Sequence, residues 1–297
     1  MKCSSPYVTK GQAVPCGQCL ACRINRRRLW THRIMLESLS SECSSFLTLT
    51  YSDEKLPILT NGLSTLSPAH LRNWLKRFRV KSRSTWRFFG TGEYGDETQR
   101  PHYHLALFGP QTCQYGHSQY SKVVKNCCPH CDLIRDTWGM GNIHVGELTP
   151  QSAAYIAGYV VKKMTSKEDE RLNGRWPEFA RMSNRPGIGA LAIPELASTL
   201  LTHDLEKTED DVPNVLRHGR TVYPLGRYLK KKLRLQIGKS EETPDVVKEQ
   251  MAEQMRPVRE FAFANSKSLK ETVREVYLGE TSRLEALDKI YKKRKHI

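Results

Sequence analysis

Hydrophobic and polar residues alternate in several short segments of the chain, as they do in half-buried β-strands. The segments are bounded by turn-forming residues, which separates them from one another. We predict strands at residues 46–51 (FLTLTY), 84–95 (STWRFFGTGEYG), 100–109 (RPHYHLALFG) and 141–148 (GNIHVGEL). Only a few residues join the second segment to the third, which favours an antiparallel hairpin.

Hydrophobic residues at helical spacing occur between and after these strands. One helix would begin with Ser67 as its cap and Pro68 at its first position, and another with Thr149 and Pro150 in the same roles. The segment after the N-terminal cysteines and the segment after Gly226 are basic and have a helical pattern. Helices therefore alternate with the predicted strands.

This order of elements predicts an α+β fold, an antiparallel β-sheet flanked by helices that pack against one face. Residues 1–168 would form this domain, with a cysteine-rich N-terminal segment and a cysteine-rich insertion at residues 111–132. The texture changes beyond it, because the chain becomes polar and rich in turns and then basic. We expect residues 169–297 to form a mostly helical C-terminal region, and the pattern assigns no role to residues 236–297.

The composition is strongly basic, with 47 lysines and arginines against 31 acidic residues and a formal charge of +16. Such an excess attracts polyanions, of which nucleic acid is the most common, although many basic proteins have no such partner. No apolar run is long enough for a membrane-spanning helix, and the first residues have no apolar signal core. We therefore expect a cytoplasmic protein with no membrane partner.

Two clusters of basic residues suit contact with DNA phosphates, which gives affinity but little sequence selection. The alternative is that they form solvated faces of helices. The candidate DNA-binding residues are Arg23, Arg26, Arg27, Arg28, Lys230, Lys231 and Lys232.

The strand at residues 100–109 contains a candidate metal site. His102 and His104 point to the same face, because side chains two apart in a strand share a face. A tight hairpin would bring Glu93 beside them, and two imidazoles with one carboxylate suit Mg²⁺ or Mn²⁺ with open positions for water and phosphate. The alternative is that both histidines are ordinary strand residues bonded to their neighbours.

A pair of tyrosines marks the helix that follows Pro150. Tyr155 and Tyr159 are four residues apart, so their phenols emerge on one face, and Lys162 or Lys163 follows one turn later. A tyrosine near a cation or metal can act as a nucleophile. Tyrosines at this spacing are also common in cores and interfaces.

The nine cysteines gather in two parts of the chain, which favours metal binding or free thiols over a disulfide framework. Two C-x₂-C segments would share one tetrahedral zinc site, or the insertion would form a local one with a histidine. The candidate structural zinc ligands are Cys16, Cys19, Cys22, Cys113, His117, Cys128 and Cys131.

Four segments together resemble the HUH endonuclease superfamily, and more closely the rolling-circle replication initiators of microviruses of the gokushovirus type. The resemblance covers roughly residues 14 to 235 and rests on PCGQCLACR, FLTLTY, GEYGDETQRPHYHLALFG and YIAGYVVKK. It implies an HUH/RRM-like core in which His102, His104 and Glu93 bind the divalent ion. It also implies that Tyr155 and Tyr159 are the nucleophiles and that Lys162 or Lys163 assists them.

The resemblance implies that one tyrosine nicks origin DNA and keeps the 5′ end as a phosphotyrosine. The free 3′-hydroxyl would prime a host polymerase, with a host helicase as a further partner in the bacterial cytoplasm. The second tyrosine would cleave the regenerated origin, so that unit-length circles are closed. Two alternatives stay open: another HUH enzyme such as a plasmid initiator, relaxase or transposase, and a zinc-stabilised DNA-binding protein without catalysis.

Overall fold

The computed structural model describes residues 2–9, 12–115, 127–159, 170–208 and 210–294. The chain forms two compact units, one of Trp30–Pro194 and one of Met1–Leu29 with Glu195–Ile297. The first unit extends past the expected boundary at residue 168, because strand β7 (Phe179–Met182) pairs with strand β4 (Arg87–Tyr94) of the main sheet.

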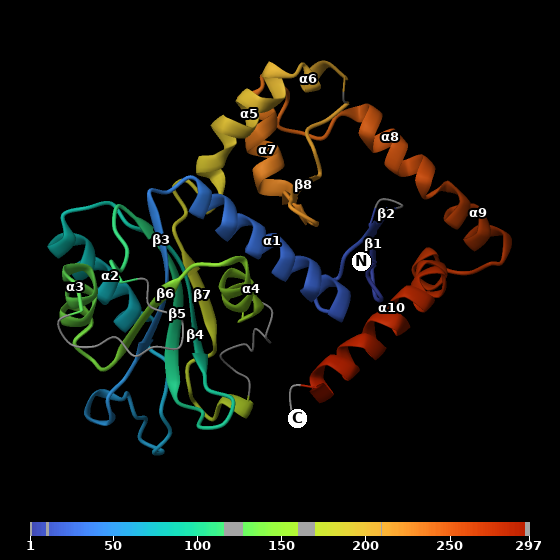
Figure 1. Cartoon of the computed structure of the whole chain (residues 1–297). Coiled ribbons are helices and arrows are strands. Elements are labelled where there is room, and N and C mark those ends of the chain that lie inside the picture. The colour runs from blue at the N-terminus through green and yellow to red at the C-terminus, as the bar shows by residue number, and fades with distance from the viewer. Residues whose placement is uncertain (1, 10–11, 116–126, 160–169, 209, 295–297) are drawn as a thin grey trace. The chain divides into compact units, whose positions relative to one another are not determined.

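A five-stranded antiparallel sheet is the centre of the first unit (Figure 1). The strands lie in the order β6-β3-β5-β4-β7. The remaining three strands are β3 (Cys43–Thr50), β5 (Pro101–Gly109) and β6 (Ile143–Glu147). The four predicted strands and the antiparallel α+β fold are confirmed, whereas β7 was not predicted.

Helices α2 (Pro68–Ser82) and α3 (Pro129–Trp138) cover one face of the sheet. The predicted start of α2 is confirmed, since Ser67 is its cap and accepts a hydrogen bond from the amide of His70. Trp74 of α2 is fully buried, and its indole donates to the hydroxyl of Thr137 in α3 at 3.1 Å. This face forms the larger of two hydrophobic clusters.

Helices α1 (Leu20–Leu39) and α4 (Pro150–Tyr159) supply the second hydrophobic cluster, which lies on the opposite face. Ile34 of α1 and Ile156 of α4 are completely buried there. The prediction that helices pack on only one face was therefore wrong. Strands such as β5 are hydrophobic on both faces over much of their length, and each face requires a cover.

The register of the sheet decides which polar side chains meet. Glu93 in β4 lies directly opposite His102 in β5, and Thr48 in β3 lies opposite His104. Paired residues in neighbouring strands point to the same face. The turn between β4 and β5 closes with the amide of Gly95 donating to the carbonyl of Arg100 at 3.0 Å. The predicted placement of Glu93 beside the histidines is confirmed.

The second unit is mostly helical and includes two small hairpins, β1 (Tyr7–Thr9) with β2 (Gln12–Val14) and β8 (Val215–His218) with β9 (Thr221–Pro224). The predicted helix after the PLG segment is confirmed as α7 (Gly226–Gln236). Its other helices are α5 (Ile193–Thr202), which begins at the boundary, α6 (Leu205–Thr208), α8 (Asp245–Gln254), α9 (Arg256–Ala264) and α10 (Leu269–Arg294). Short 3₁₀ turns occur at Asp53–Lys55, Glu170–Leu172 and Ala190–Ala192 of the chain.

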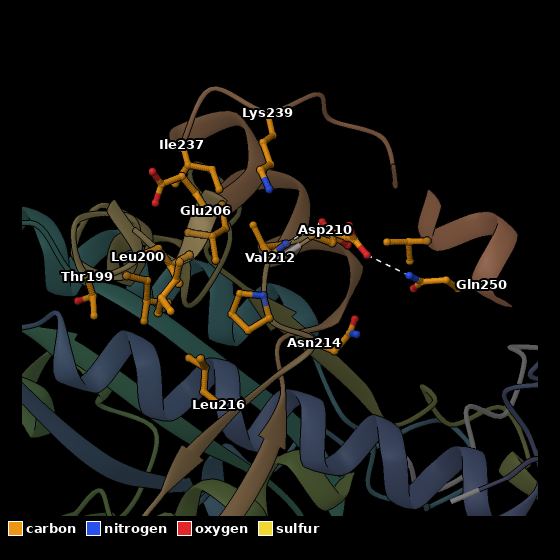
Figure 2. Close-up of a pocket in the computed structure, with 16 residues that line it drawn as sticks. Thr199, Leu200, Glu206, Asp210, Val212, Asn214, Leu216, Ile237, Lys239 and Gln250 are labelled. Carbon is orange, nitrogen blue, oxygen red and sulfur yellow. Dashed lines mark hydrogen bonds between the residues drawn. The ribbon is translucent and has the colours of Figure 1, made fainter. Parts of the chain in front are cut away.

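A largely apolar pocket of about 620 Å³ lies within this second unit, between α5, α7 and α8 (Figure 2). Val212 and Leu216 are among the residues that line it, and Asp210 accepts a hydrogen bond from Gln250 at 3.0 Å across it. In the described part of the chain, no helix has both the length and the hydrophobicity that a membrane span requires.

Candidate metal centre and tyrosine pair

Glu93, His102 and His104 form a compact group of metal-ligand type on the sheet. One oxygen of Glu93, Oε1, lies 2.8 Å from Nε2 of His102 and 2.8 Å from Nε2 of His104. The ligand atoms of all three residues lie within 4.8 Å of one another. The three residues proposed from sequence therefore come together, and a single small cation could be bound by all of them.

Hydrogen bonds on the far side of each imidazole orient the two rings. Nδ1 of His102 donates to the carbonyl oxygen of Arg100 at 3.1 Å, and Nδ1 of His104 lies 2.8 Å from the hydroxyl of Thr48. In metal sites, such outer contacts fix the ring and leave Nε2 for the ion. Both rings here direct Nε2 toward Glu93.

The carboxylate of Glu93 is only 2 % exposed. Burial acts to raise its pKa, but hydrogen bonds from His102 and His104 outweigh burial and hold the pKa below its ordinary value. The other oxygen, Oε2, is buried and has no hydrogen-bond partner among the described residues. Because an unsatisfied buried carboxylate oxygen is costly, this donor set fits a divalent cation that would satisfy it.

Both tyrosines of α4 lie over His104. The phenol oxygen of Tyr155 is 3.4 Å from Nε2 of His104, and the ring of Tyr159 stacks near the same imidazole with centroids 5.9 Å apart. The two phenol rings are themselves 4.9 Å apart. Tyr155 is 44 % exposed, so a large ligand such as a DNA strand has access to it.

The sequence of α4 explains how it places these phenols. The hydroxyl of Thr149 caps the helix by accepting the amide of Ser152 at 3.2 Å. Ala153 and Ala157 are small and buried, which lets the helix lie close against the sheet. Tyr155 lies between them in sequence and points outward near the sheet. The other two candidate catalytic residues, Lys162 and Lys163, lie outside the described residues.

The electrostatic environments of the two phenols differ. Burial raises the pKa of Tyr159, and the negative charge of Glu93 and the hydrogen bond with Tyr155 raise it further. A cation bound between Glu93 and the histidines would oppose this effect, because it would reverse the local charge.

A polar recess that sequence analysis missed adjoins the candidate metal centre. It measures about 350 Å³, and Thr48, whose hydroxyl contacts His104, forms part of its wall. The alternation in FLTLTY does place Thr48 and Thr50 on one face, so a signal was present. The other residues that line the recess are Thr50, Arg135, Gly141, Asn142, Ile143 and His144.

Each cysteine-rich segment forms a four-cysteine cluster of its own. Cys16, Cys19 and Cys22 join Cys3, whereas Cys113, Cys128 and Cys131 join Cys127. The idea that two C-x₂-C segments share one site is thereby replaced by two separate clusters. His117, the ligand proposed for a local site in the insertion, lies outside the described residues.

The candidate DNA-binding residues differ in their surroundings. Arg26, Arg27 and Lys232 are exposed. The guanidinium of Arg28 instead donates to the carbonyl of Val222. The remaining three are half-buried, and of these Lys230 pairs with Asp211 and Lys231 with Glu241, while Arg23 is the third.

Comparison with known proteins gives the class: the chain is related to replication-associated proteins of phages. Residues 44–164, which include the strands and helix of the candidate site, match the model of the "Replication-associated protein ORF2" family. The predicted resemblance to microvirus-type replication initiators is thereby confirmed.

Three curated relatives illustrate this relationship. The chain is 33 % identical to "Replication-associated protein VP4" of Bdellovibrio phage phiMH2K over 53 % of this chain and 51 % of that protein. It is 32 % identical to "Replication-associated protein ORF2" of Spiroplasma virus 4 over 60 % of this chain and 56 % of that protein. Identity to "Replication-associated protein ORF4" of Chlamydia phage 1 is 28 %, over 77 % of this chain and 55 % of that protein.

The matched region spans about half the length of these curated relatives. No solved structure gives a significant match to the chain.

Proposed function

We propose that this protein is a metal-dependent DNA nickase and strand transferase that initiates rolling-circle replication. The observation that carries the proposal is the position of His104, whose Nε2 lies 2.8 Å from Glu93 and 3.4 Å from the phenol oxygen of Tyr155. A candidate metal ligand and a candidate nucleophile thus meet at one nitrogen atom. The relationship to phage replication-associated proteins supports a role in replication.

Glu93, His102 and His104 would hold Mg²⁺ or Mn²⁺, because three ligands of nitrogen and oxygen type leave open positions for water and phosphate. The bound ion would polarise a phosphoryl oxygen of the DNA and offset negative charge that develops during the displacement.

Tyr155 and Tyr159 would supply the nucleophile. In our proposal the phenol oxygen of one tyrosine bonds to phosphorus while the bond from phosphorus to the 3′ oxygen breaks. The phenol loses its proton, and the leaving 3′ oxygen gains one to become a free hydroxyl. The product is a 5′-phosphotyrosine on the protein, and the hydroxyl would prime a host polymerase.

The pair of tyrosines would allow both cleavages at one centre. After one round of copying, the second phenol cleaves the regenerated origin, and the new 3′-hydroxyl attacks the first phosphotyrosine. That attack restores the first phenol and closes a circle. Each step exchanges one phosphodiester for another, so the joining step would need no ATP. The ring separation of 4.9 Å is compatible with alternate use of the two phenols.

The polar recess beside the centre is where we place the nucleotides next to the cleaved bond. Thr50, Asn142 and Arg135 offer hydroxyl, amide and guanidinium groups there, which are common contacts to phosphate and sugar. The exposed residues Arg26 and Arg27 would add affinity through further phosphate contacts. This surface would favour a single strand, and a host helicase would supply it from duplex DNA.

The test is to incubate the full chain with Mn²⁺ and circular single-stranded DNA that contains the genome encoding it. We expect a protein–DNA adduct that survives heat and detergent and disappears after nuclease treatment. Sequencing the protein-linked 5′ end identifies the origin, and mass spectrometry of the linked peptide identifies the tyrosine.

A variant with both Tyr155→Phe and Tyr159→Phe is the matched control, since it keeps the rings and loses only the phenol oxygens. It should bind the DNA and form no adduct. If the unaltered chain binds this DNA tightly with Mn²⁺ and also forms no adduct, the chain is a DNA-binding protein without catalysis. If the double variant still forms the adduct, a residue other than these tyrosines is the nucleophile.

A further inference from the structure

Eight of the nine cysteines lie in two groups of four. The first group is Cys3, Cys16, Cys19 and Cys22, and it lies wholly within the unit formed by the chain's ends. Within it, Sγ of Cys16 is 4.0 Å from Sγ of Cys22, and Sγ of Cys19 is 3.7 Å from Sγ of Cys3. All four sulfur atoms lie within 4.8 Å of one another.

The second group lies in the unit that contains the sheet. It consists of Cys113, which follows β5, and of Cys127, Cys128 and Cys131 at the start of α3. Sγ of Cys113 is 3.8 Å from Sγ of Cys127, and the four sulfurs again lie within 4.8 Å of one another. Residues 116–126, between the first and second of these ligands, lie outside the described residues.

These separations are those of four thiolates around a single tetrahedral ion. With a zinc–sulfur bond of about 2.3 Å, tetrahedral geometry places the sulfurs roughly 3.8 Å apart. The observed 3.7–4.0 Å distances are far longer than a disulfide bond of about 2.05 Å. An iron–sulfur cluster would hold its cysteines farther apart, because each binds a different iron.

Both groups are built in the same way at the start of a helix. Cys128 is the cap residue of α3 and Cys131 lies in its first turn, just as Cys19 precedes α1 and Cys22 lies in its first turn. The amides of a helix N-terminus favour thiolates over thiols. In the first group, amides also donate directly to sulfur: that of Cys16 to Cys3 at 3.3 Å and that of Cys19 to Cys16 at 3.3 Å.

The N-terminal group also has a structural reason to bind an ion. It closes the base of the β1–β2 hairpin, with Cys3 before the hairpin and Cys16 just after it. All three residues of β1 are exposed, and Tyr7 is 62 % exposed. A two-stranded hairpin without a core is marginal in water, so a metal crosslink would hold it in place.

The second group is buried in a hydrophobic cluster. Cys113, Cys128 and Cys131 belong to the core beside α2 and α3. Several thiolates in such surroundings require a compensating cation.

We propose that each group of four cysteines binds one structural Zn²⁺, so that the chain carries two zinc ions in addition to the ion at the candidate metal centre. Four thiolates complete the coordination of zinc and leave no open position, which makes both sites structural. The proposal assigns Cys3 and Cys127 as ligands that the C-x₂-C spacing does not reveal. It does not depend on the proposed nickase function.

The first test needs no substitution. The full chain, purified without added metal and dialysed against EDTA, is analysed by elemental mass spectrometry, and its thiols are alkylated under native conditions. We expect about two zinc ions per chain and alkylation confined to the half-buried Cys43. Fewer than two zinc ions, iron in place of zinc, or rapid alkylation of the partly exposed Cys16, Cys19 and Cys127 would overturn the proposal.

The second test assigns the ions to the two groups. Cys3→Ser and Cys127→Ser should each reduce the zinc content from two ions to one, whereas Cys43→Ser, the matched control, should leave it at two. A chain with His102→Ala and His104→Ala should also retain two, which separates these ions from the candidate metal centre. Unchanged zinc content in Cys3→Ser or Cys127→Ser would show that the altered residue is not a ligand. If a variant does not fold, cobalt substitution in the unaltered chain replaces it, and absence of the strong thiolate charge-transfer band would reject the sites.

Discussion

The phenol oxygen of Tyr155 lies 3.4 Å from Nε2 of His104, the same nitrogen atom that contacts the buried carboxylate of Glu93. Tyr159 lies one helical turn further on, and its side chain is more deeply buried. The two tyrosines are therefore not equivalent in the structure. This difference leads to the first prediction.

We expect Tyr155 to perform the first cleavage. Tyr155→Phe should lower the rate of adduct formation by a factor on the order of 10³ or more, because it removes the nucleophile. Tyr159→Phe should retain the first adduct and lose closure of the circle. Burial raises the pKa of Tyr159, which disfavours its phenolate before DNA binds.

Single-turnover assays with labelled origin DNA measure both steps, with linear adduct and closed circle separated on a denaturing gel. Tyr115, which is 70 % exposed, supplies a control in Tyr115→Phe, which should leave both steps unchanged. A normal first adduct with Tyr155→Phe would assign the first cleavage to Tyr159 instead.

The second prediction concerns Thr48, whose hydroxyl holds Nδ1 of His104 at 2.8 Å. Thr48→Val keeps the shape of the side chain and removes this contact. Because outer contacts of this kind orient metal-binding histidines, we expect the affinity for Mn²⁺ to fall about 10–100-fold. Isothermal titration calorimetry measures the affinity, and the Mn²⁺ concentration that supports cleavage should rise in parallel.

Thr50 provides the matched control, since it lies two residues away in the same strand and on the same face. Its hydroxyl donates to the carbonyl of Asn142 and does not hold a candidate ligand. Thr50→Val should leave the Mn²⁺ affinity close to that of the unaltered chain. Equal losses in both variants would mean that Thr48 acts through general packing of β3.

The sequence predicts much of the site because its key residues are close together along the chain. A short hairpin between Glu93 and His102 limits the possible pairings, and the observed register matches the expected one. The cap at Thr149 likewise defines the start of α4 and therefore the direction of the tyrosines. Local patterns of this kind suffice where the partners are a few residues apart.

Other features depend on contacts between distant residues, which periodicity does not reveal. Strand β7 has only four residues and joins the sheet through β4, about ninety residues earlier in the chain. Cys3 lies thirteen residues before Cys16, outside any C-x₂-C spacing. The partner of Glu37 in α1 is Arg87 in β4, which no local pattern indicates.

The third prediction concerns this buried ion pair. Glu37 is completely buried, pairs with Arg87, and accepts the amide of Gly189 at 2.6 Å through its other oxygen. Glu37→Gln should lower the free energy of unfolding of the sheet unit by about 3 kcal/mol, because the arginine loses its charged partner. Urea unfolding followed by tryptophan fluorescence measures the loss.

Glu253→Gln is the control for this substitution, since Glu253 pairs with Arg256 at 2.8 Å on the exposed surface. Exposed pairs contribute less than about 1 kcal/mol, so this variant should unfold almost like the unaltered chain. If Glu37→Gln has an equally small effect, the buried pair does not stabilise the unit.

The last prediction is a pH dependence in the second unit. Both oxygens of Asp211 contact Arg234 of α7, each at 2.6 Å, and the side chain is only 8 % exposed. Burial acts to raise the pKa of Asp211, but the hydrogen bonds from Arg234, from the amide of Val212 and from Lys230 lower it to about 2. The native state therefore binds this proton less readily than the unfolded chain does.

A lowered native pKa stabilises the fold above the unfolded pKa, which is about 3.9 for aspartate, and this stabilisation is lost as the pH falls toward the native value. We expect the unaltered chain to exceed Asp211→Asn in stability by roughly 2 kcal/mol at pH 7. The difference should shrink as the pH falls from about 4 toward 2. Urea midpoints at several pH values measure it. Asp204→Asn, which removes an exposed pair with Lys207, should show a small difference at every pH. A difference for Asp211→Asn that does not change with pH would show that the carboxylate's charge does not stabilise α7.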